Sequence, residues 1–270
     1  MSSTKVFVET SVLISASVYA TSKDLNVELV HHFYNISIPL FGFFREHIDE
    51  RIGITTATVE DEARTSLTKA ITETLKERAE AEPSKRDELF KAFAAFLNTS
   101  FDNLSKNLAI LLREPVLDED RNKTFPEVSR MYYDLESKEV IGDVKEVAKA
   151  KAQYVPPRFR RMAEGIYREQ LFEESLRQIP LKRLRRKPVG ERDKKILAEA
   201  VYILKRYKKR EAVAMFLAST DCHFSPVRGV RTITTVTDEI EKRFGIVCDW
   251  PDKVLQKITA MAKKAKKRRK

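Results

Sequence analysis

The chain has 270 residues, of which 51 are Lys or Arg and 40 are Asp or Glu, and its formal net charge is +11. Hydrophobic residues make up 42% of the chain, which is enough for a core and excludes a chain that is disordered throughout. No apolar run approaches the roughly 18 residues of a membrane span, and two cysteines cannot form a disulfide framework or a four-cysteine zinc site. We therefore expect a soluble cytoplasmic protein with no membrane partner, or a nuclear one if the source cell has a nucleus.

The first third of the chain alternates short apolar segments with helical patterns. The predicted elements are, in order, a strand over 5–9, a helix over 11–20 capped by Thr10, helices over 27–34 and 40–50, a strand over 54–55, and a long charged helix over 59–82 capped by Thr58. Strands followed by helices favour a parallel sheet.

The middle of the chain has only helical periodicity, and the alternation returns near the C-terminus. Helices are predicted over 87–112, 127–136, 143–153, 158–177 and 192–207, strands over 213–219, 231–234 and 246–248, and a helix that Thr237 caps and Gly245 ends. We interpret residues 1–75 and 188–258 as two halves of one α/β domain. An all-helical insertion over 76–187 separates them, and residues 259–270 form a disordered basic tail.

The positive charge is concentrated in two segments. Residues 151–187 and 263–270 each carry a net charge of +7, whereas residues 1–150 carry −7. A basic surface beside an acidic one predicts a polyanion partner and a reaction performed by carboxylates.

The spacing of residues excludes two common kinds of binding site, a glycine-rich phosphate loop and a structural zinc site. No two of the seven glycines lie closer than 11 positions apart, so the chain has no glycine-rich phosphate loop. His223 and Cys222 have only Cys248 as a further soft ligand, which is too few for a structural zinc site. Nucleotide-loop and zinc functions are therefore not expected.

Four acidic residues lie at or soon after the predicted carboxyl ends of strands, or at the start of a helix. Glu9 ends the first strand, Asp221 follows the strand over 213–219, Glu62 lies one turn into a helix, and Asp193 opens another. Such positions converge at one edge of a parallel sheet. Carboxylates gathered there would repel one another unless a hard divalent cation such as Mg²⁺ or Mn²⁺ neutralised them. Such a site can hydrolyse phosphodiesters.

Four segments resemble the motifs of PIN-domain nucleases, in the order of that family. They are KVFVETSVLISA at 5–16, ITTATVEDEA at 54–63, DKKILAEAVYI at 193–203 and FLASTDCHFS at 216–225, and IVCDWPDKVL at 246–255 resembles the closing strand. The resemblance covers about 75 residues at each end of the chain and leaves the helical middle unmatched.

This resemblance implies a three-layer α/β/α sandwich around a parallel sheet, interrupted by the helical insertion. It also implies a metal-dependent ribonuclease in which Glu9, Glu62, Asp193 and Asp221 hold Mg²⁺ or Mn²⁺. Thr10 and Thr220 would orient these ligands through hydrogen bonds without contacting the metal themselves. Glu9 departs from the family pattern, because Asp is usual there, and the extra methylene moves the carboxylate by about 1.5 Å.

RNA is the expected partner, and a homodimer or a ribonucleoprotein assembly stays open. The residues expected to bind the RNA backbone are Lys182, Arg183, Arg185, Arg186, Lys187, Lys266, Lys267, Arg268 and Arg269. Two alternatives remain at this stage. One is an RNA-binding scaffold on a catalytically degenerate PIN fold, and the other is a structure-specific DNA nuclease of the flap-cleaving type.

Overall fold

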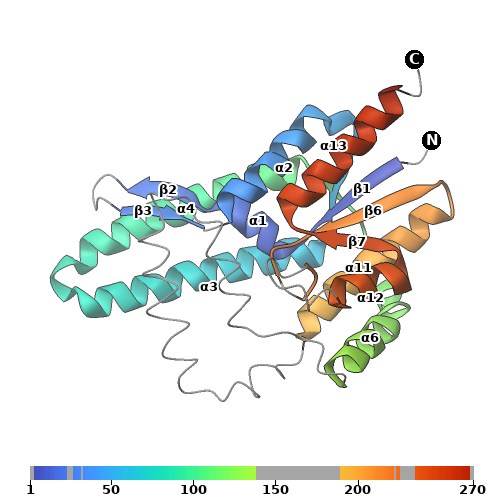
Figure 1. Cartoon of the computed structure of the whole chain (residues 1–270). Coiled ribbons are helices and arrows are strands. Elements are labelled where there is room, and N and C mark those ends of the chain that lie inside the picture. Colours follow the sequence, from blue (N-terminus) through green and yellow to red (C-terminus); the bar gives the residue numbers. More distant parts are fainter. Residues whose placement is uncertain are drawn as a thin grey trace.

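A computed structural model describes residues 3–22, 27–31, 33–137, 189–221, 223–225 and 235–267. Its centre is a parallel five-stranded sheet with the strand order β5-β4-β1-β6-β7, and Figure 1 labels β1, β6 and β7 of this sheet. The strands are β1 (Ser3–Val8), β4 (Gly53–Thr55), β5 (Leu112–Arg113), β6 (Val213–Ala218) and β7 (Ile246–Asp249). The chain is therefore a mixed α/β protein.

The two central strands form where the sequence has its most continuous apolar runs. β1 and β6 pair in parallel over six residues each, from Ser3 opposite Val213 to Val8 opposite Ala218. The last four residues of both strands are buried, as expected for strands covered on both faces. The expected strands at 5–9, 54–55, 213–219 and 246–248 are confirmed within a residue or two.

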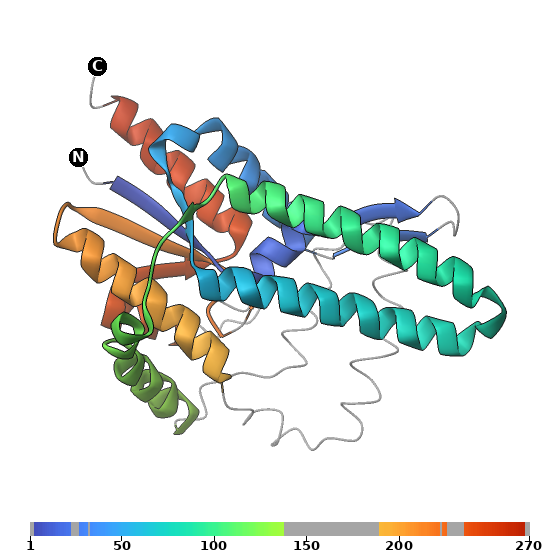
Figure 2. The same cartoon turned by 180° about the vertical axis from the view of Figure 1, so that it is seen from behind.

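Helices cover both faces of the sheet (Figures 1 and 2). One face is covered by α1 (Thr10–Ser17), α2 (Tyr34–Glu46), which continues into the 3-10 turn η1 (Ile48–Glu50), and α13 (Pro251–Lys267). The other is covered by α11 (Glu191–Lys208) and α12 (Thr235–Phe244), and α5 (Asp118–Asn122) and α6 (Phe125–Ser137) pack on α11. Gly245 ends α12 as predicted, with a φ of 72° that favours glycine.

Two long helices form an arm that extends beyond the carboxyl ends of the strands (Figures 1 and 2). α3 (Ala57–Ala81) leads outward, the turn η2 (Pro83–Lys85) reverses the chain, and α4 (Arg86–Ala109) returns to β5. With a rise of about 1.5 Å per residue, α3 is about 37 Å long. A two-stranded hairpin of β2 (Tyr19–Ser22) and β3 (Val27–Val30) packs along α4.

Several sequence-based predictions were wrong. Residues 27–30 are strand β3 rather than the start of a helix, because they pair with β2 from Tyr19 opposite Val30 to Ser22 opposite Val27. The segment is short and contains two valines, so the pairing outweighs its helical pattern. Thr56, not Thr58, caps α3, since its hydroxyl accepts from the Val59 amide.

The predicted domain boundaries also need correction. The boundary at residue 75 falls inside α3, and the region over 76–187 is not entirely helical, because it supplies β5 to the central sheet. Residues 259–267 are not disordered but continue α13, whose lysines and alanines are strong helix formers. Val254 and Ile258 anchor that helix in the core. The predicted helices over 143–153 and 158–177 and the strand over 231–234 lie outside the described residues.

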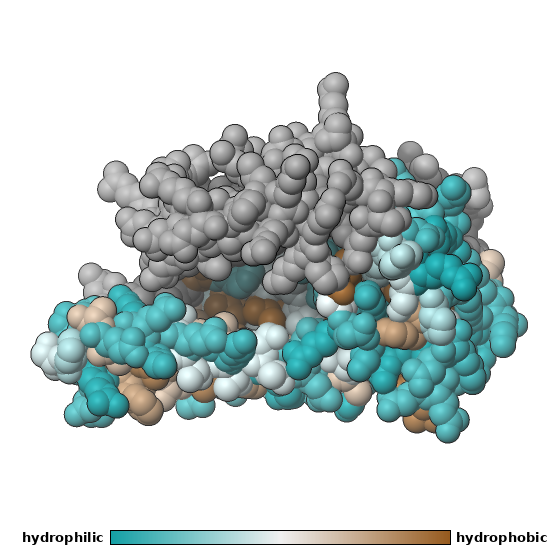
Figure 3. All heavy atoms as spheres, turned by 90° about the horizontal axis from the view of Figure 1, so that it is seen from below, coloured by the Kyte–Doolittle hydropathy of each residue, from teal (hydrophilic) through white to brown (hydrophobic). Residues whose placement is uncertain are grey.

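The core is continuous between the sheet and both helical layers. Exposed large hydrophobic residues are scattered, as Phe90 on α4 and Tyr133 on α6 illustrate. Figure 3 shows that hydrophilic residues dominate the described part of the face seen from below. Within the described ranges, no helix has the length and apolar character needed to cross a membrane.

Candidate functional site

The four predicted acidic residues lie at the carboxyl edge of the sheet. Glu9 directly follows β1, Asp221 lies three residues after β6, Asp193 is in the first turn of α11, and Glu62 is in the second turn of α3. Their elements are neighbours because β1 lies between β4 and β6 in the sheet. Parallel topology therefore brings together residues that are more than 200 positions apart.

Glu9 is the most enclosed of the four, with only 4% of its surface exposed. It caps α1, and one of its carboxylate oxygens accepts from the Ser11 amide at 3.0 Å, from the Ser11 hydroxyl, and from the Ser219 hydroxyl at 2.9 Å. Burial, together with the nearby charge of Asp221, raises the pKa of Glu9 to about 8 against the lowering effect of these hydrogen bonds. Glu9 is thus poised to hold a proton near neutral pH unless a cation replaces it.

Ser11 and Ser219 connect the end of β1 to the loop after β6. The Ser11 hydroxyl accepts from the Thr220 amide at 3.0 Å, and the Ser219 hydroxyl accepts from the Asp221 amide at 2.9 Å. Thr220 was expected to support the site with its hydroxyl, whereas the contact shown here is made by its backbone. Sequence reasoning missed both serines, although each lies two residues from a predicted carboxylate.

Glu62 is held by Thr10, as the sequence predicted for a supporting hydroxyl. The Thr10 hydroxyl donates to the Glu62 carboxylate at 2.8 Å. Partial burial raises the pKa of Glu62, and the charges of Asp193 and Asp221 raise it as well, whereas the hydrogen bond from Thr10 and the charge of Arg192 lower it. These influences place Glu62 in the electrostatic neighbourhood of both aspartates.

His223 lies between the two aspartates, a role that sequence reasoning did not assign to it. Its Nδ1 is 2.9 Å from Asp193 Oδ2 and 3.4 Å from Asp221 Oδ1, and its amide donates to Asp221 Oδ1 at 2.9 Å. The available signal was its position two residues after Asp221. Because one imidazole nitrogen contacts both carboxylates, His223 fixes the position of Asp193 relative to Asp221.

Glu199 on α11 is a second residue that the sequence did not single out. Only 1% of its surface is exposed, yet it accepts from the hydroxyls of Thr56 and Thr58, each at 2.6 Å, and from Arg121 at 3.1 Å. The contact joins the first turn of α3 to α11. Since Glu62 is six residues after Thr56 and Asp193 six residues before Glu199, this contact sets how the two acidic helices approach each other.

The donors at this edge fit a hard divalent cation by type, because the four predicted ligands all offer carboxylate oxygens. However, no group of three or more His, Cys, Asp or Glu side chains within the described ranges is arranged to hold a metal ion. The side chains are held by hydroxyls, amides and His223 instead. A cation would therefore have to draw them closer together.

The predicted RNA-binding residues are distributed differently from the carboxylates. Lys182, Arg183, Arg185, Arg186, Lys187, Arg268 and Arg269 lie outside the described residues. Lys266 and Lys267 are in the last turn of α13, which runs back along the sheet so that its C-terminal end lies near the chain's N-terminus (Figures 1 and 2). That end is at the edge of the sheet opposite Glu9.

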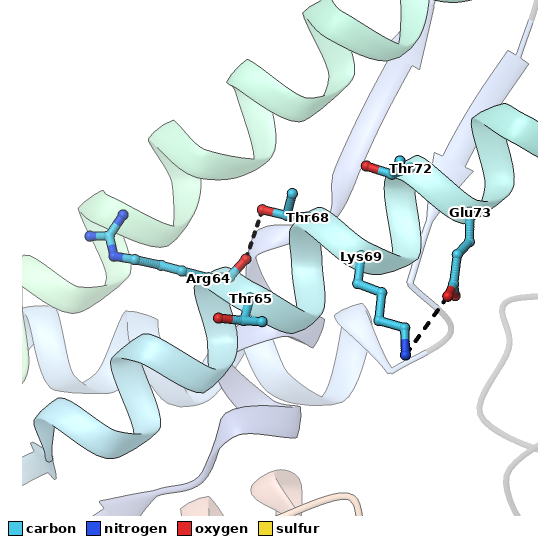
Figure 4. Close-up of a pocket in the computed structure, with 6 residues that line it drawn as sticks. All are labelled: Arg64, Thr65, Thr68, Lys69, Thr72 and Glu73. Carbon is cyan, nitrogen blue, oxygen red and sulfur yellow. Dashed lines mark hydrogen bonds and ion pairs between the residues drawn. The ribbon is translucent and has the colours of Figure 1, made fainter.

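The part of α3 beyond Glu62 carries a shallow pocket. It is lined by one helix face, and Figure 4 shows these side chains: Arg64, Thr65, Thr68, Lys69, Thr72 and Glu73. The pocket is on the arm and not between the carboxylates.

Comparison with protein-family models, curated proteins and solved structures gives no significant match for this chain.

Proposed function

We propose that this chain is a metal-dependent ribonuclease with a PIN-like fold, which hydrolyses RNA phosphodiester bonds at the carboxyl edge of its sheet. The observation that supports the proposal is that four separate elements place Glu9, Glu62, Asp193 and Asp221 at the same edge of the sheet. The charge of Asp221 acts on both Glu9 and Glu62, and that of Asp193 acts on Glu62. Crowding of like charges that shifts pKa values is typical of functional sites.

Glu9, Glu62, Asp193 and Asp221 would hold Mg²⁺ or Mn²⁺. When bound, the ion would supply Lewis acidity and lower the pKa of a coordinated water. The chain's own groups then have defined tasks. Ser11 and Ser219 orient Glu9, Thr10 orients Glu62, and His223 holds Asp193 beside Asp221. Glu199 fixes α3 against α11.

A non-catalytic RNA-binding scaffold is the second candidate, and the state of Glu9 favours it. One oxygen of this carboxylate already accepts three hydrogen bonds, and its pKa of about 8 favours the neutral acid. A neutral Glu9 binds a cation poorly. The two candidates differ in whether the site cleaves RNA.

Incubation with labelled single-stranded and structured RNA separates the two candidates. The chain is assayed with Mg²⁺, with Mn²⁺ and with a chelator, beside the variants Asp193→Asn and Asp221→Asn. We expect metal-dependent cleavage that each variant reduces at least 100-fold, on the scale of losing a group that stabilises the transition state. A matched control is Asp252→Asn, an acidic residue in the first turn of α13.

Cleavage that survives chelation or both substitutions would overturn the proposed mechanism. Binding of RNA without cleavage under any of these conditions would favour the scaffold. A DNA flap substrate, tested in parallel, addresses the remaining alternative of a structure-specific DNA nuclease.

A further inference from the structure

The imidazole of His223 lies among the oxygens of the carboxylate site. Its Nδ1 is 2.9 Å from Asp193 Oδ2 and 3.4 Å from Asp221 Oδ1. The three side chains are partly open to solvent, since between 21% and 38% of the surface of each is exposed. An ion that arrives from solvent can therefore reach one nitrogen and two carboxylates at the same place.

The backbone around His223 is held firmly. Its amide donates to Asp221 Oδ1 at 2.9 Å, and its carbonyl accepts from the hydroxyl of Tyr132, a buried residue of α6, at 2.8 Å. The next residue, Phe224, is fully buried in the core, and the Ser225 amide donates to the Asp221 carbonyl at 2.8 Å. A rigid turn thus presents the imidazole to the aspartates, as a binding site requires of its side chains.

The spacing of these atoms suits neighbouring ligands of one ion. Where each bond to an octahedral ion is about 2.1 Å long, adjacent ligands lie about 3 Å apart. The contacts of His223 Nδ1 with the two aspartates, at 2.9 and 3.4 Å, are on this scale. The backbone of Asp193 is held by α11 and that of His223 by its turn, so the adjustment to an ion would fall on the side chains.

Nitrogen and oxygen ligands favour different ions. Mg²⁺ is bound through oxygens and water, whereas imidazole suits transition metals of the first row. A neutral imidazole whose proton is on Nε2 offers the lone pair of Nδ1 to such an ion. Adding one imidazole to a set of carboxylates therefore shifts the preference of a site from Mg²⁺ toward Mn²⁺.

We infer that His223 is a ligand of the metal site, through Nδ1 beside Asp193 and Asp221, and that it makes the site prefer Mn²⁺ to Mg²⁺. The inference rests on the metal site of the proposed function, but not on cleavage of RNA. Ligation adds to the positioning of the two aspartates, which another hydrogen-bonding side chain could perform. Loss of positioning alone would weaken the binding of both ions equally, whereas loss of a nitrogen ligand weakens Mn²⁺ more.

Binding of Mn²⁺ to the full chain, without RNA, tests the inference. Electron paramagnetic resonance titration gives the affinity for Mn²⁺, competition with Mg²⁺ gives the preference, and pulsed measurements detect a nitrogen bonded to the ion by its hyperfine coupling. We expect the native chain to prefer Mn²⁺ and to show this coupling. The amide of His223→Gln can still hydrogen-bond to the aspartates, but this variant should lose affinity for Mn²⁺ at least about tenfold, lose the coupling, and change less in its affinity for Mg²⁺.

His47→Gln is the matched control, because it makes the same substitution away from the site. His47 follows α2 and precedes β4, and its Nδ1 lies 3.0 Å from the Phe43 carbonyl while its ring stacks on that of Phe43. This variant should bind both ions like the native chain and keep the nitrogen coupling.

Bound Mn²⁺ without nitrogen coupling in the native chain would overturn the inference whatever the variants do, and would leave the carboxylate site standing. A coupling that persists in His223→Gln, or an unchanged preference between the ions in that variant, would overturn it as well. So would a rise in Mn²⁺ affinity in His223→Gln, since the imidazole would then compete with the ion.

The same measurements distinguish this inference from the proposed function. Binding of neither ion would overturn both the inference and the metal-dependent mechanism. Nitrogen-coupled Mn²⁺ in a chain that cleaves no RNA would support the role of His223 and overturn only the proposed function.

Discussion

The hydroxyl of Thr56 donates a hydrogen bond to the buried carboxylate of Glu199 over 2.6 Å. Thr56 caps α3 and Glu199 is in the middle of α11, so the bond connects two helices that the sequence separates by more than 130 residues. Thr58 and Arg121 complete the shell around the same carboxylate. A buried anion with this many partners is stable only while all of them are present.

Removing this carboxylate should therefore destabilise the protein strongly. Glu199→Ala removes the buried carboxylate from Arg121, whose side chain is only 14% exposed and is then paired with Asp118 at the surface, and it leaves the Thr56 hydroxyl without this acceptor. We expect the free energy of unfolding to fall by about 3 kcal/mol. Urea denaturation measures the change. Glu73→Ala is the control, because it removes an exposed partner of Lys69 and should change stability by less than about 0.5 kcal/mol. Similar losses in the two variants would contradict this account of Glu199.

Glu9 should make the stability of the metal-free protein depend on pH. Its pKa is about 8 in the folded state against an ordinary value of 4.5, so between these values the folded state holds a proton that the unfolded state has lost. Stability from this group is complete below about pH 4.5 and is lost as the pH rises through about 8. The slope approaches about 1.4 kcal/mol per pH unit.

Urea denaturation in chelator, from pH 5 to pH 9, tests this expectation by comparing the native chain with Glu9→Gln. The pKa of Glu62 is raised as well and contributes a slope of the same sign, so the difference between the two proteins isolates Glu9. We expect the native chain to lose more stability than the variant over this range. Parallel curves would mean that Glu9 titrates near its ordinary value.

The sheet and the carboxylates were predictable because they depend on local patterns. Continuous apolar runs mark β1 and β6, and an acidic residue after such a run lies at the carboxyl edge whatever the rest of the fold does. Glu199 could not be predicted in the same way. It lies among apolar residues on a helical stripe, and its partners come from the start of α3 and from α5, which packs on α11.

The errors have a similar origin. Residues 27–30 form a strand because β2 pairs with them, and the short segment has no strong preference of its own. The end of α13 is helical because its apolar face is anchored further up the helix, a contact that a lysine-rich segment does not reveal. Both outcomes depend on tertiary contacts and not on composition.

Two glycines should respond in opposite directions to the same substitution. A Cβ at Gly53 in β4 would lie 2.6 Å from a methyl carbon of Leu111 and 2.9 Å from the Phe44 ring, so Gly53→Ala should cost about 1–3 kcal/mol through overpacking. Gly42 lies inside α2 with nothing within 4 Å of an added Cβ, and Gly42→Ala should stabilise the protein by about 0.5–1 kcal/mol. Thermal unfolding of both variants measures the signs. A stabilising Gly53→Ala would mean that β4 is not packed as described.

Under the proposed function, the basic end of α13 should contribute to affinity for RNA but not to the chemical step. This end of the helix lies at the edge of the sheet opposite the carboxylates, so contacts made there fall on phosphates remote from a bond cleaved beside Glu9 (Figure 1). Deleting residues 264–270 removes six basic residues and keeps the buried anchors Val254 and Ile258. We expect a higher Kd for RNA with a shallower salt dependence, because fewer counterions are displaced, and an unchanged kcat at saturating RNA. Filter binding at several salt concentrations and single-turnover cleavage measure the two effects. A fall in kcat with unchanged affinity would place this end of the chain at the reacting phosphate, against the geometry of the fold.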